Sequence, residues 1–178
     1  MRRSVLLALP LLIASPAWAG YTLAGKPKVT FQATGTVMDM EGVGSTVKVT
    51  DDGTSVSFAV PMATVSTDNA LRDDHMNNTY VEVAKFPDVV VALNKAAFKL
   101  PTAAGEKLKG SVTGTLTVHG VSQPVTVSYS AKRGDTSTKV DATFSLDVSK
   151  HGIVIPEYLG VTLDPKMKAT ASLELIDG

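Results

Sequence analysis

The chain has 178 residues, with 17 basic and 17 acidic side chains and no cysteine. The balanced charge offers no basic surface for nucleic acid, and the missing thiols exclude disulfides, thiolate chemistry and a lipid anchor on cysteine. The length fits one domain with a buried core.

The first nineteen residues have the layout of a secretory signal peptide. Arg2 and Arg3 precede an apolar run over residues 5–13, and the segment ends in the small-x-small triplet Ala17-Trp18-Ala19. The apolar run is shorter than the roughly 20 residues of a membrane helix. We predict cleavage after Ala19 by the general secretory route, which leaves residues 20–178 as one exported periplasmic domain without a membrane segment.

After the predicted cleavage site, apolar and polar residues alternate with period two along most of the chain, which predicts β-strands. A hairpin is expected over residues 45–61 with a turn at Asp51-Asp52-Gly53, and another around His119-Gly120. The eight predicted strand segments are residues 28–35, 46–50, 55–60, 89–94, 110–118, 124–130, 138–149 and 166–175.

Each predicted strand has one dominant apolar face, and no helical crossover joins the strands, so the sheet should be antiparallel. We expect an all-β fold in which eight strands close into an up-and-down barrel and lose their edges. A two-sheet sandwich is the alternative. A barrel of this size either fills with side chains or holds one small ligand, and the mixture of valine, alanine and glycine on the inward faces leaves both outcomes open.

The alternation stops over residues 69–89, where "NALRDDHMNNTYVEVAKFPDV" gathers charged and amide side chains. Three preceding residues are good helix N-caps: Ser66, Thr67 and Asp68. Two pairs of side chains four residues apart can meet on one side of a helix: Leu71 with His75, and Met76 with Tyr80. Asn77 and Asn78 suit a left-handed helix end. We therefore predict a short helix and return loop that cover one mouth of the barrel as a lid.

Two motifs resemble the YceI-like family of exported bacterial proteins. The first comprises Arg72, Asp73, His75 and Met76, followed by Lys85-Phe86-Pro87, and the second comprises Gly114, Leu116, Thr117, His119, Gly120 and Val121. The closing segment "HGIVIPEYLGV" is also similar to the family's pattern. The Lys-His pair that members often carry early in the domain is absent after Phe31, so the chain resembles a divergent branch.

The resemblance implies a lipocalin-like barrel with a hydrophobic tunnel that holds a long isoprenoid or similar lipid. We expect the following side chains to line the tunnel: Phe31, Phe58, Val89, Val91, Leu116, Val118, Phe144 and Leu146. A second group is expected near its mouth: Leu71, Met76, Tyr80, Phe86 and Tyr158. A third group is expected to be structural, with His75 holding the lid by a hydrogen bond and Arg72 paired to an aspartate: Arg72, Asp73, His75, His119 and Gly120.

A catalytic function has less support from the sequence. Three histidines can hold a catalytic zinc, but His75, His119 and His151 lie in separate turns without His-x-x-x-His spacing. The chain has no Gly-x-Ser-x-Gly nucleophile motif. We predict a non-catalytic lipid-binding protein with no cofactor, metal or nucleic-acid partner. An envelope interaction protein with a filled barrel and a histidine-dependent metalloenzyme are the alternatives.

Overall fold

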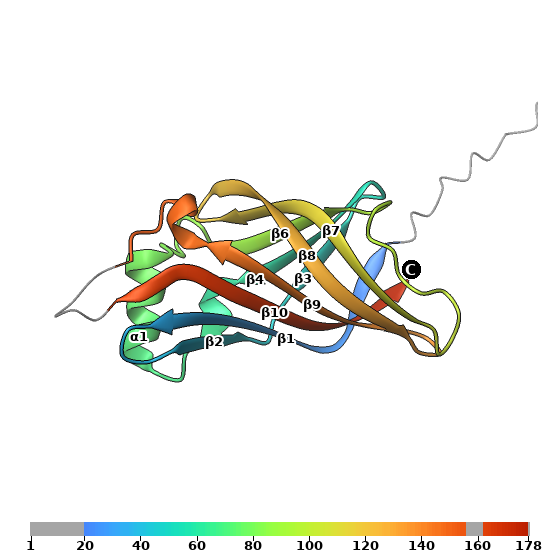
Figure 1. The fold of residues 1–178 in the computed structure, drawn as a ribbon, viewed down its shortest axis with the longest axis horizontal. Helices are drawn as coiled ribbons and strands as arrows, with labels where there is room; N and C mark the ends of the chain where they lie inside the picture. The colour runs from blue at the N-terminus through green and yellow to red at the C-terminus, as the bar shows by residue number, and fades with distance from the viewer. Residues whose placement is uncertain (1–19, 156–161, 178) are drawn as a thin grey trace, which may run out of the picture.

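The computed structural model describes residues 20–155 and 162–177, and the chain folds into one strongly curled antiparallel sheet (Figure 1). Ten strands follow the hydrogen-bonded order β3-β4-β6-β7-β8-β9-β10-β1-β2-β5. Their bounds are β1 Tyr21–Gly35, β2 Met40–Gly44, β3 Lys48–Asp51, β4 Ser55–Pro61, β5 Val65–Ser66, β6 Asp88–Asn94, β7 Lys107–Val118, β8 Val121–Arg133, β9 Thr138–Asp147 and β10 Leu163–Asp177. The predicted signal peptide and Tyr158 lie outside the described residues.

The two ends of this sheet meet and close the barrel. Two continuous runs of the chain make this closure, and each run contains two successive strands. β2 and β3 follow one another along one run, and β4 and β5 along the next, where the 3-10 turn η1 (Met62–Thr64) separates them. β2 pairs with both β1 and β5, whereas β3 pairs with β4. The ten strands therefore form eight neighbouring runs that close on one another, and the predicted all-β antiparallel barrel is confirmed.

The β7–β8 hairpin turns at His119 and Gly120, as the sequence predicts. The ladder pairs Val118 with Val121 directly across the two-residue turn. His119 has φ 51° and Gly120 has φ 74°, which is the left-handed pair that matches the twist of a hairpin. A Cβ on Gly120 would lie 2.6 Å from Cε1 of Phe86, so the close approach of that ring also requires glycine.

β8 and β9 pair along only part of their length. The ladder joins residues 128–133 to residues 138–143, and the strands diverge beyond it. The 3-10 turn η3 (Val148–His151) covers the divergence. Nδ1 of His151 lies 2.9 Å from the carbonyl oxygen of Val121, and Nε2 of Gln123 donates to the carbonyl oxygen of Lys150 at 3.3 Å. Since a carbonyl only accepts, His151 is the donor in the first contact.

A short helical segment covers one end of the barrel, at the left of Figure 1. Helix α1 (Ala70–His75) continues into the π-helical turn η2 (Met76–Tyr80), and we call α1 and η2 together the lid. The predicted lid helix is confirmed, but both of its predicted ends are wrong. Asn69 is the N-cap, with its side chain accepting the Arg72 N–H at 3.0 Å. The helix does not end at Asn77 or Asn78, and the left-handed residue is Glu82, with φ 49°.

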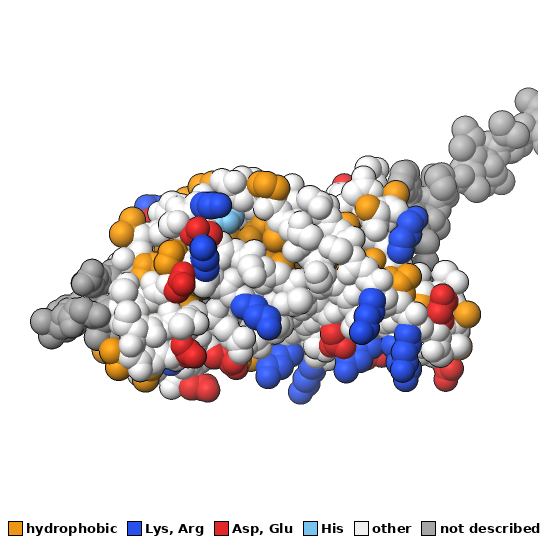
Figure 2. Space-filling model, viewed as in Figure 1, with side chains coloured by type: hydrophobic (Ala, Val, Ile, Leu, Met, Phe, Trp, Pro, Cys, Tyr) orange, Lys and Arg blue, Asp and Glu red, His pale blue; other side chains and the backbone are white. Residues whose placement is uncertain are grey.

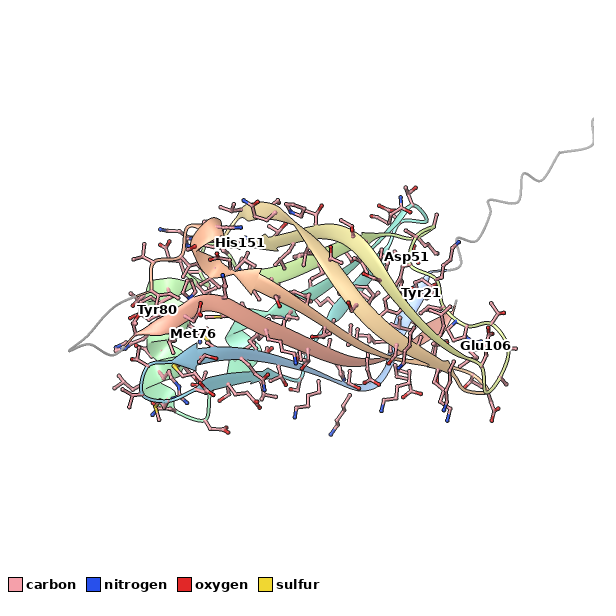
Figure 3. The ribbon with its side chains drawn as sticks, viewed as in Figure 1. Tyr21, Asp51, Met76, Tyr80, Glu106 and His151 are labelled. Carbon is pink, nitrogen blue, oxygen red and sulfur yellow. The ribbon has the colours of Figure 1, made fainter. Side chains whose placement is uncertain are left out.

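The opposite end of the barrel is filled by aromatic side chains. Phe98, in the loop after β6, is 4 % exposed. The centroid of its ring lies 5.0 Å from that of Tyr129, 6.1 Å from that of Phe58 and 6.3 Å from that of Tyr21, each in an edge-to-face arrangement. Tyr129 also donates its hydroxyl to the carbonyl oxygen of Lys99 at 2.8 Å. Figure 3 shows Tyr21 at the end away from Met76 and Tyr80. We call these four rings the aromatic plug.

Within residues 20–155 and 162–177, no helix has the length and apolarity needed to cross a lipid bilayer.

Replacing Phe98 with alanine should lower the free energy of unfolding by about 3–5 kcal/mol, because it removes a buried ring and leaves a cavity. Urea unfolding followed by circular dichroism measures the change. The control is Ala97→Ser in the same loop, where the side chain is exposed and the expected change is within about 0.5 kcal/mol. A loss for Phe98→Ala no larger than the control's would show that the plug is not part of the stabilising core.

Candidate ligand-binding site

An apolar chamber of about 620 Å³ lies at the lid end of the barrel. Its walls come from inward-facing residues of the sheet and from the segment after η3, and the lid lies over it. The apolar residues of the lining are Phe31, Ala33, Met38, Met40, Gly42, Met62, Val65, Leu71, Met76, Tyr80, Val81, Val89, Val118, Leu146, Val148, Ile153, Val154, Ile155, Leu163 and Met167. Its polar residues are Glu41, Thr67, Asn69, Arg72, His75 and Thr162. The chamber is therefore suited to a hydrophobic guest.

Small residues on the inward face create part of the space. A row of inward residues crosses four strands, in the order Leu146, Met167, Ala33 and Met40. Ala33 is the smallest member and lies between two flexible side chains. On β2, a Cβ on Gly42 would lie 3.1 Å from Cγ1 of Val65. Small residues at this end thus let neighbouring side chains approach while the chamber stays open.

Methionine is concentrated at this chamber. The sequence contains six methionines, and all five that follow Met1 line the chamber: Met38, Met40, Met62, Met76 and Met167. They reach it from the β1–β2 turn, from β2 and β10, from η1 and from the lid. Methionine is unbranched and adapts to irregular shapes, which suits a surface that contacts an apolar ligand.

The first turn of the lid is anchored to Thr67, which is 8 % exposed. Arg72 donates from Nε to Oγ1 of Thr67 at 2.8 Å, and its Nη2 donates to the carbonyl oxygen of Thr67. Asp73 accepts the Thr67 N–H at 2.8 Å, the Thr67 hydroxyl, and the Ser66 hydroxyl at 2.9 Å. The hydrogen bonds from Thr67 hold the pKa of the Asp73 carboxyl below its usual range, although burial acts in the opposite direction.

This arrangement corrects two predictions about the lid. Among the described residues, Arg72 makes no direct ion pair with an aspartate, because Arg72 and Asp73 both bind Thr67. The His75 side chain makes no hydrogen bond within the described part of the chain, and it lines the chamber instead. Thr67, predicted as a helix cap, is the residue that fixes the lid.

A second anchor ties the segment after the lid to the β7–β8 turn. Nε2 of His119 lies 2.9 Å from Oε2 of Glu82, and Nδ1 of His119 lies 3.3 Å from the carbonyl oxygen of His151. The ring of Phe86 packs edge-on against His119, with the ring centroids 4.4 Å apart. Hydrogen bonds from Lys85 and then from His119 lower the pKa of Glu82. His119 thus joins the lid's return loop to η3.

The predicted lipid contacts fall into two groups. Seven of them line the chamber: Phe31, Leu71, Met76, Tyr80, Val89, Val118 and Leu146. Val91, Leu116 and Phe144 lie two residues further along their strands toward the aromatic plug, where they pack in the core. Phe58 belongs to the plug, and Phe86 packs against His119. The described chamber therefore collects the predicted contacts nearest the lid, whereas these other predicted contacts pack in the core or in the aromatic plug.

The sequence reasoning missed most of the chamber's other walls. The missed residues include Ala33, Met38, Met40, Gly42, Met62, Val65, Ile153, Leu163 and Met167. Alternation marks Ala33 and Met167 as inward-facing, but their small or flexible side chains gave no reason to favour them. Met38 and Met62 lie in turns, where period two carries no information. The clustering of methionine became visible only when the turns were placed in space.

The three histidines do not form a metal site. His75 lies in the lid, His119 in a hairpin turn, and His151 is 2 % exposed in η3. In the described residues, no group of three or more histidine, aspartate or glutamate side chains is placed to hold a metal ion.

A second hollow of about 760 Å³ opens to the outside of the barrel, and it shares Ala33, Met40, Leu146 and Met167 with the chamber. It extends over β2, β1, β10 and β9 to the place where β8 diverges. On this face of the molecule, Figure 2 shows charged side chains spread along the lower edge and hydrophobic side chains exposed between the polar ones above it. The charged members of the hollow are Asp39, Glu41, Asp147, Lys150, Lys166 and Lys168. Leu116 and Val125, which are 2 % and 6 % exposed, close the barrel wall behind it. This hollow is open and carries charged side chains at its rim, so the more uniformly apolar chamber is the better candidate for a hydrophobic ligand.

Sequence comparison relates the chain to one protein family. A family model described as YceI-like domain matches residues 21–175. A UPF0312 protein of Pseudomonas syringae pv. syringae (strain B728a) is 27% identical over 137 residues, which cover 73% of this chain and 68% of that protein. A UPF0312 protein of Pseudomonas putida (strain W619) is 28% identical over 137 residues, with the same coverage of the two chains.

Two solved structures share the fold. One is a polyisoprenoid binding domain from Saccharophagus degradans, with a TM-score of 0.75 and 14% sequence identity over 90% of this chain and 99% of that chain. The other is BcnA of Burkholderia cenocepacia, with a TM-score of 0.65 and 16% identity over 83% of this chain and 95% of that chain. At these identities the likeness concerns the fold alone.

The Asp73 anchor should make stability depend on pH. Because the pKa of Asp73 is lowered in the folded chain, its stabilisation is complete above the unfolded carboxyl pKa of about 3.9 and is lost as the pH falls through the folded pKa. The Asp73→Asn variant should therefore lose less stability than the wild type between about pH 6 and about pH 2.5. Urea midpoints across this range measure the difference.

The matched control for that experiment is Asp74→Asn. It removes the same charge from the adjacent residue, whose carboxylate accepts a hydrogen bond from Asn78 and lies outside the Thr67 contacts. Its urea midpoint should follow the wild-type pH dependence. An Asp73→Asn curve parallel to that of the control would contradict the anchor.

Proposed function

The chain belongs to the YceI-like family, and we propose that it is a non-catalytic binding protein whose lid-end chamber holds a lipid of the isoprenoid class. The observation that carries this proposal is the apolar chamber, whose lining is mostly aliphatic and thioether side chains. The polar side chains of Thr67, Asn69, Arg72 and His75 lie on or next to the lid. A guest with a hydrocarbon body and one polar end matches this distribution.

The energetics of burial suit such a guest. Removing a CH₂ group from water contributes about 0.8 kcal/mol, so one five-carbon isoprene unit contributes roughly 3–4 kcal/mol gross. Ordering the guest reduces this gain. A chamber of about 620 Å³ lies within the range of roughly 300–1,000 Å³ that is typical for small-ligand pockets. A few isoprene units can therefore be enclosed, and the rest of a longer chain would extend past the lid.

Binding, rather than catalysis, is supported by the family match and by the structural neighbour named as a polyisoprenoid binding domain. The signal-peptide pattern of the first nineteen residues supports a location in the periplasm. Together these observations favour a protein that keeps a water-insoluble molecule enclosed in an aqueous compartment.

The direct test is native mass spectrometry of the protein purified without detergent, followed by extraction with organic solvent. A stoichiometric apolar molecule should appear in the native spectrum and in the extract. The ligand-free protein should also take up added geranylgeraniol, an isoprenoid alcohol. A chain that carries no such molecule and binds none of the added alcohol would refute the proposal.

Replacing Val118 with tryptophan should fill the chamber from its wall, because Val118 is 4 % exposed and lines it. The indole ring would displace a part of the guest equivalent to about four CH₂ groups. The binding free energy would then weaken by about 3 kcal/mol, which lowers the affinity for geranylgeraniol more than a hundredfold. Titration of the ligand-free protein measures this change. Thr115→Trp places the same ring on the exposed face of the same strand, and its affinity should remain that of the wild type. Equal affinities for the two variants would locate the ligand elsewhere.

A further inference from the structure

We propose that the methionines around the chamber are an oxidation site, at which conversion of thioethers to sulfoxides expels an apolar ligand. The inference rests on the proposed function, since it concerns the occupancy of the same chamber. It starts from the observation that all five methionines after Met1 line this one cavity. The chain has no cysteine, so these thioethers are the sulfur atoms of the folded domain that an oxidant can attack.

The methionines differ in their access to solvent. Met38 is 61 % exposed and Met62 is 6 % exposed. Met40, Met76 and Met167 are half-buried. Oxidation follows exposure, so a soluble oxidant should modify Met38 first, then the three half-buried residues, and Met62 last.

The surroundings of Met40 and Met167 determine the effect of oxidation. Ala33 is the cross-strand neighbour of both residues, and Leu146 is the other neighbour of Met167. None of these neighbouring side chains can donate a hydrogen bond. A sulfoxide oxygen at either position would therefore make the chamber wall polar without a side-chain partner on the adjacent strands. An aliphatic guest packed against it would leave that oxygen desolvated, which is unfavourable.

The chemical step requires a peroxide as the oxidant. With hydrogen peroxide, a lone pair of the methionine sulfur attacks one peroxide oxygen, so that an S–O bond forms and the O–O bond breaks. The sulfur is oxidised by two electrons, and the peroxide is reduced to one water molecule after proton transfer. Methionine sulfoxide reductases reverse the change, so the occupancy of the chamber can be restored.

The experiment loads the ligand-free protein with geranylgeraniol and treats it with hydrogen peroxide. Peptide mass spectrometry locates each sulfoxide, and native mass spectrometry measures the retained alcohol. Affinity should fall roughly tenfold or more once Met40, Met76 or Met167 is oxidised. Treatment with methionine sulfoxide reductases should restore binding to the same sample. This recovery excludes irreversible unfolding as the cause of the loss.

Two variants, each compared with its own untreated form, identify the responsible residues. The M40L/M76L/M167L variant replaces the half-buried thioethers with side chains of similar volume, and its affinity should change little on peroxide treatment. Met38→Leu should keep the full sensitivity of the wild type. A triple variant as sensitive as the wild type would overturn the inference, as would a wild type that is oxidised at these residues and still retains the alcohol.

The same experiment distinguishes a failure of the proposed lipid binding from a failure of the proposed oxidation site. A protein that binds no geranylgeraniol before any oxidation would refute the binding proposal, and the oxidation site with it. A protein that binds the alcohol equally well before and after oxidation would refute the oxidation site alone.

Discussion

The chamber depends on an uneven distribution of side-chain volume along the barrel axis. The end formed by Tyr21, Phe58, Phe98 and Tyr129 is filled by four aromatic rings. At the other end the inward positions include alanine, glycine, valine and methionine beside Phe31 and Leu146. Eight neighbouring strands enclose enough width for only one small guest, so the size of the side chains at each level decides whether that level is core or cavity. The barrel fold provides an enclosed interior, and the sizes of the inward-facing side chains determine where the chamber lies within it.

The cover of the chamber is held by polar contacts at both ends of one inserted segment. At the start of the segment, Thr67 binds Arg72 and Asp73 of the lid. After the lid, Glu82 contacts His119. Between these anchors, the lid contributes Leu71, Met76 and Tyr80 to the lining. Arg72, Asp73 and Glu82 therefore take part in contacts that hold this segment in place, while Leu71, Met76 and Tyr80 contribute to the chamber lining. A segment that resembles an active site in composition functions as a cover.

Strict alternation made the strands predictable, and most parts of the structure without alternation were missed, with the lid helix as the exception. The eight predicted segments correspond to the eight runs of the barrel because each run must bury one face. β2 was overlooked, since Gly42 and Gly44 remove the apolar signal from its inward positions. Phe98 lies in a loop, so no periodicity indicates that it is buried. The short chamber could not be inferred either, because alternation gives the facing of a residue but not the depth at which an aromatic cluster closes the barrel.

The aromatic plug would also set the direction in which a guest of the proposed kind travels. In the part of the chain that the structure describes, the four rings pack together at the end away from the lid, so an elongated guest would have to leave by the end through which it entered. Whichever terminus goes in first comes out last, and the narrow interior gives it no room to turn around. A molecule with one hydrophilic terminus would therefore present that terminus to the exterior during loading, residence and hand-over, and any acceptor would always meet the same end.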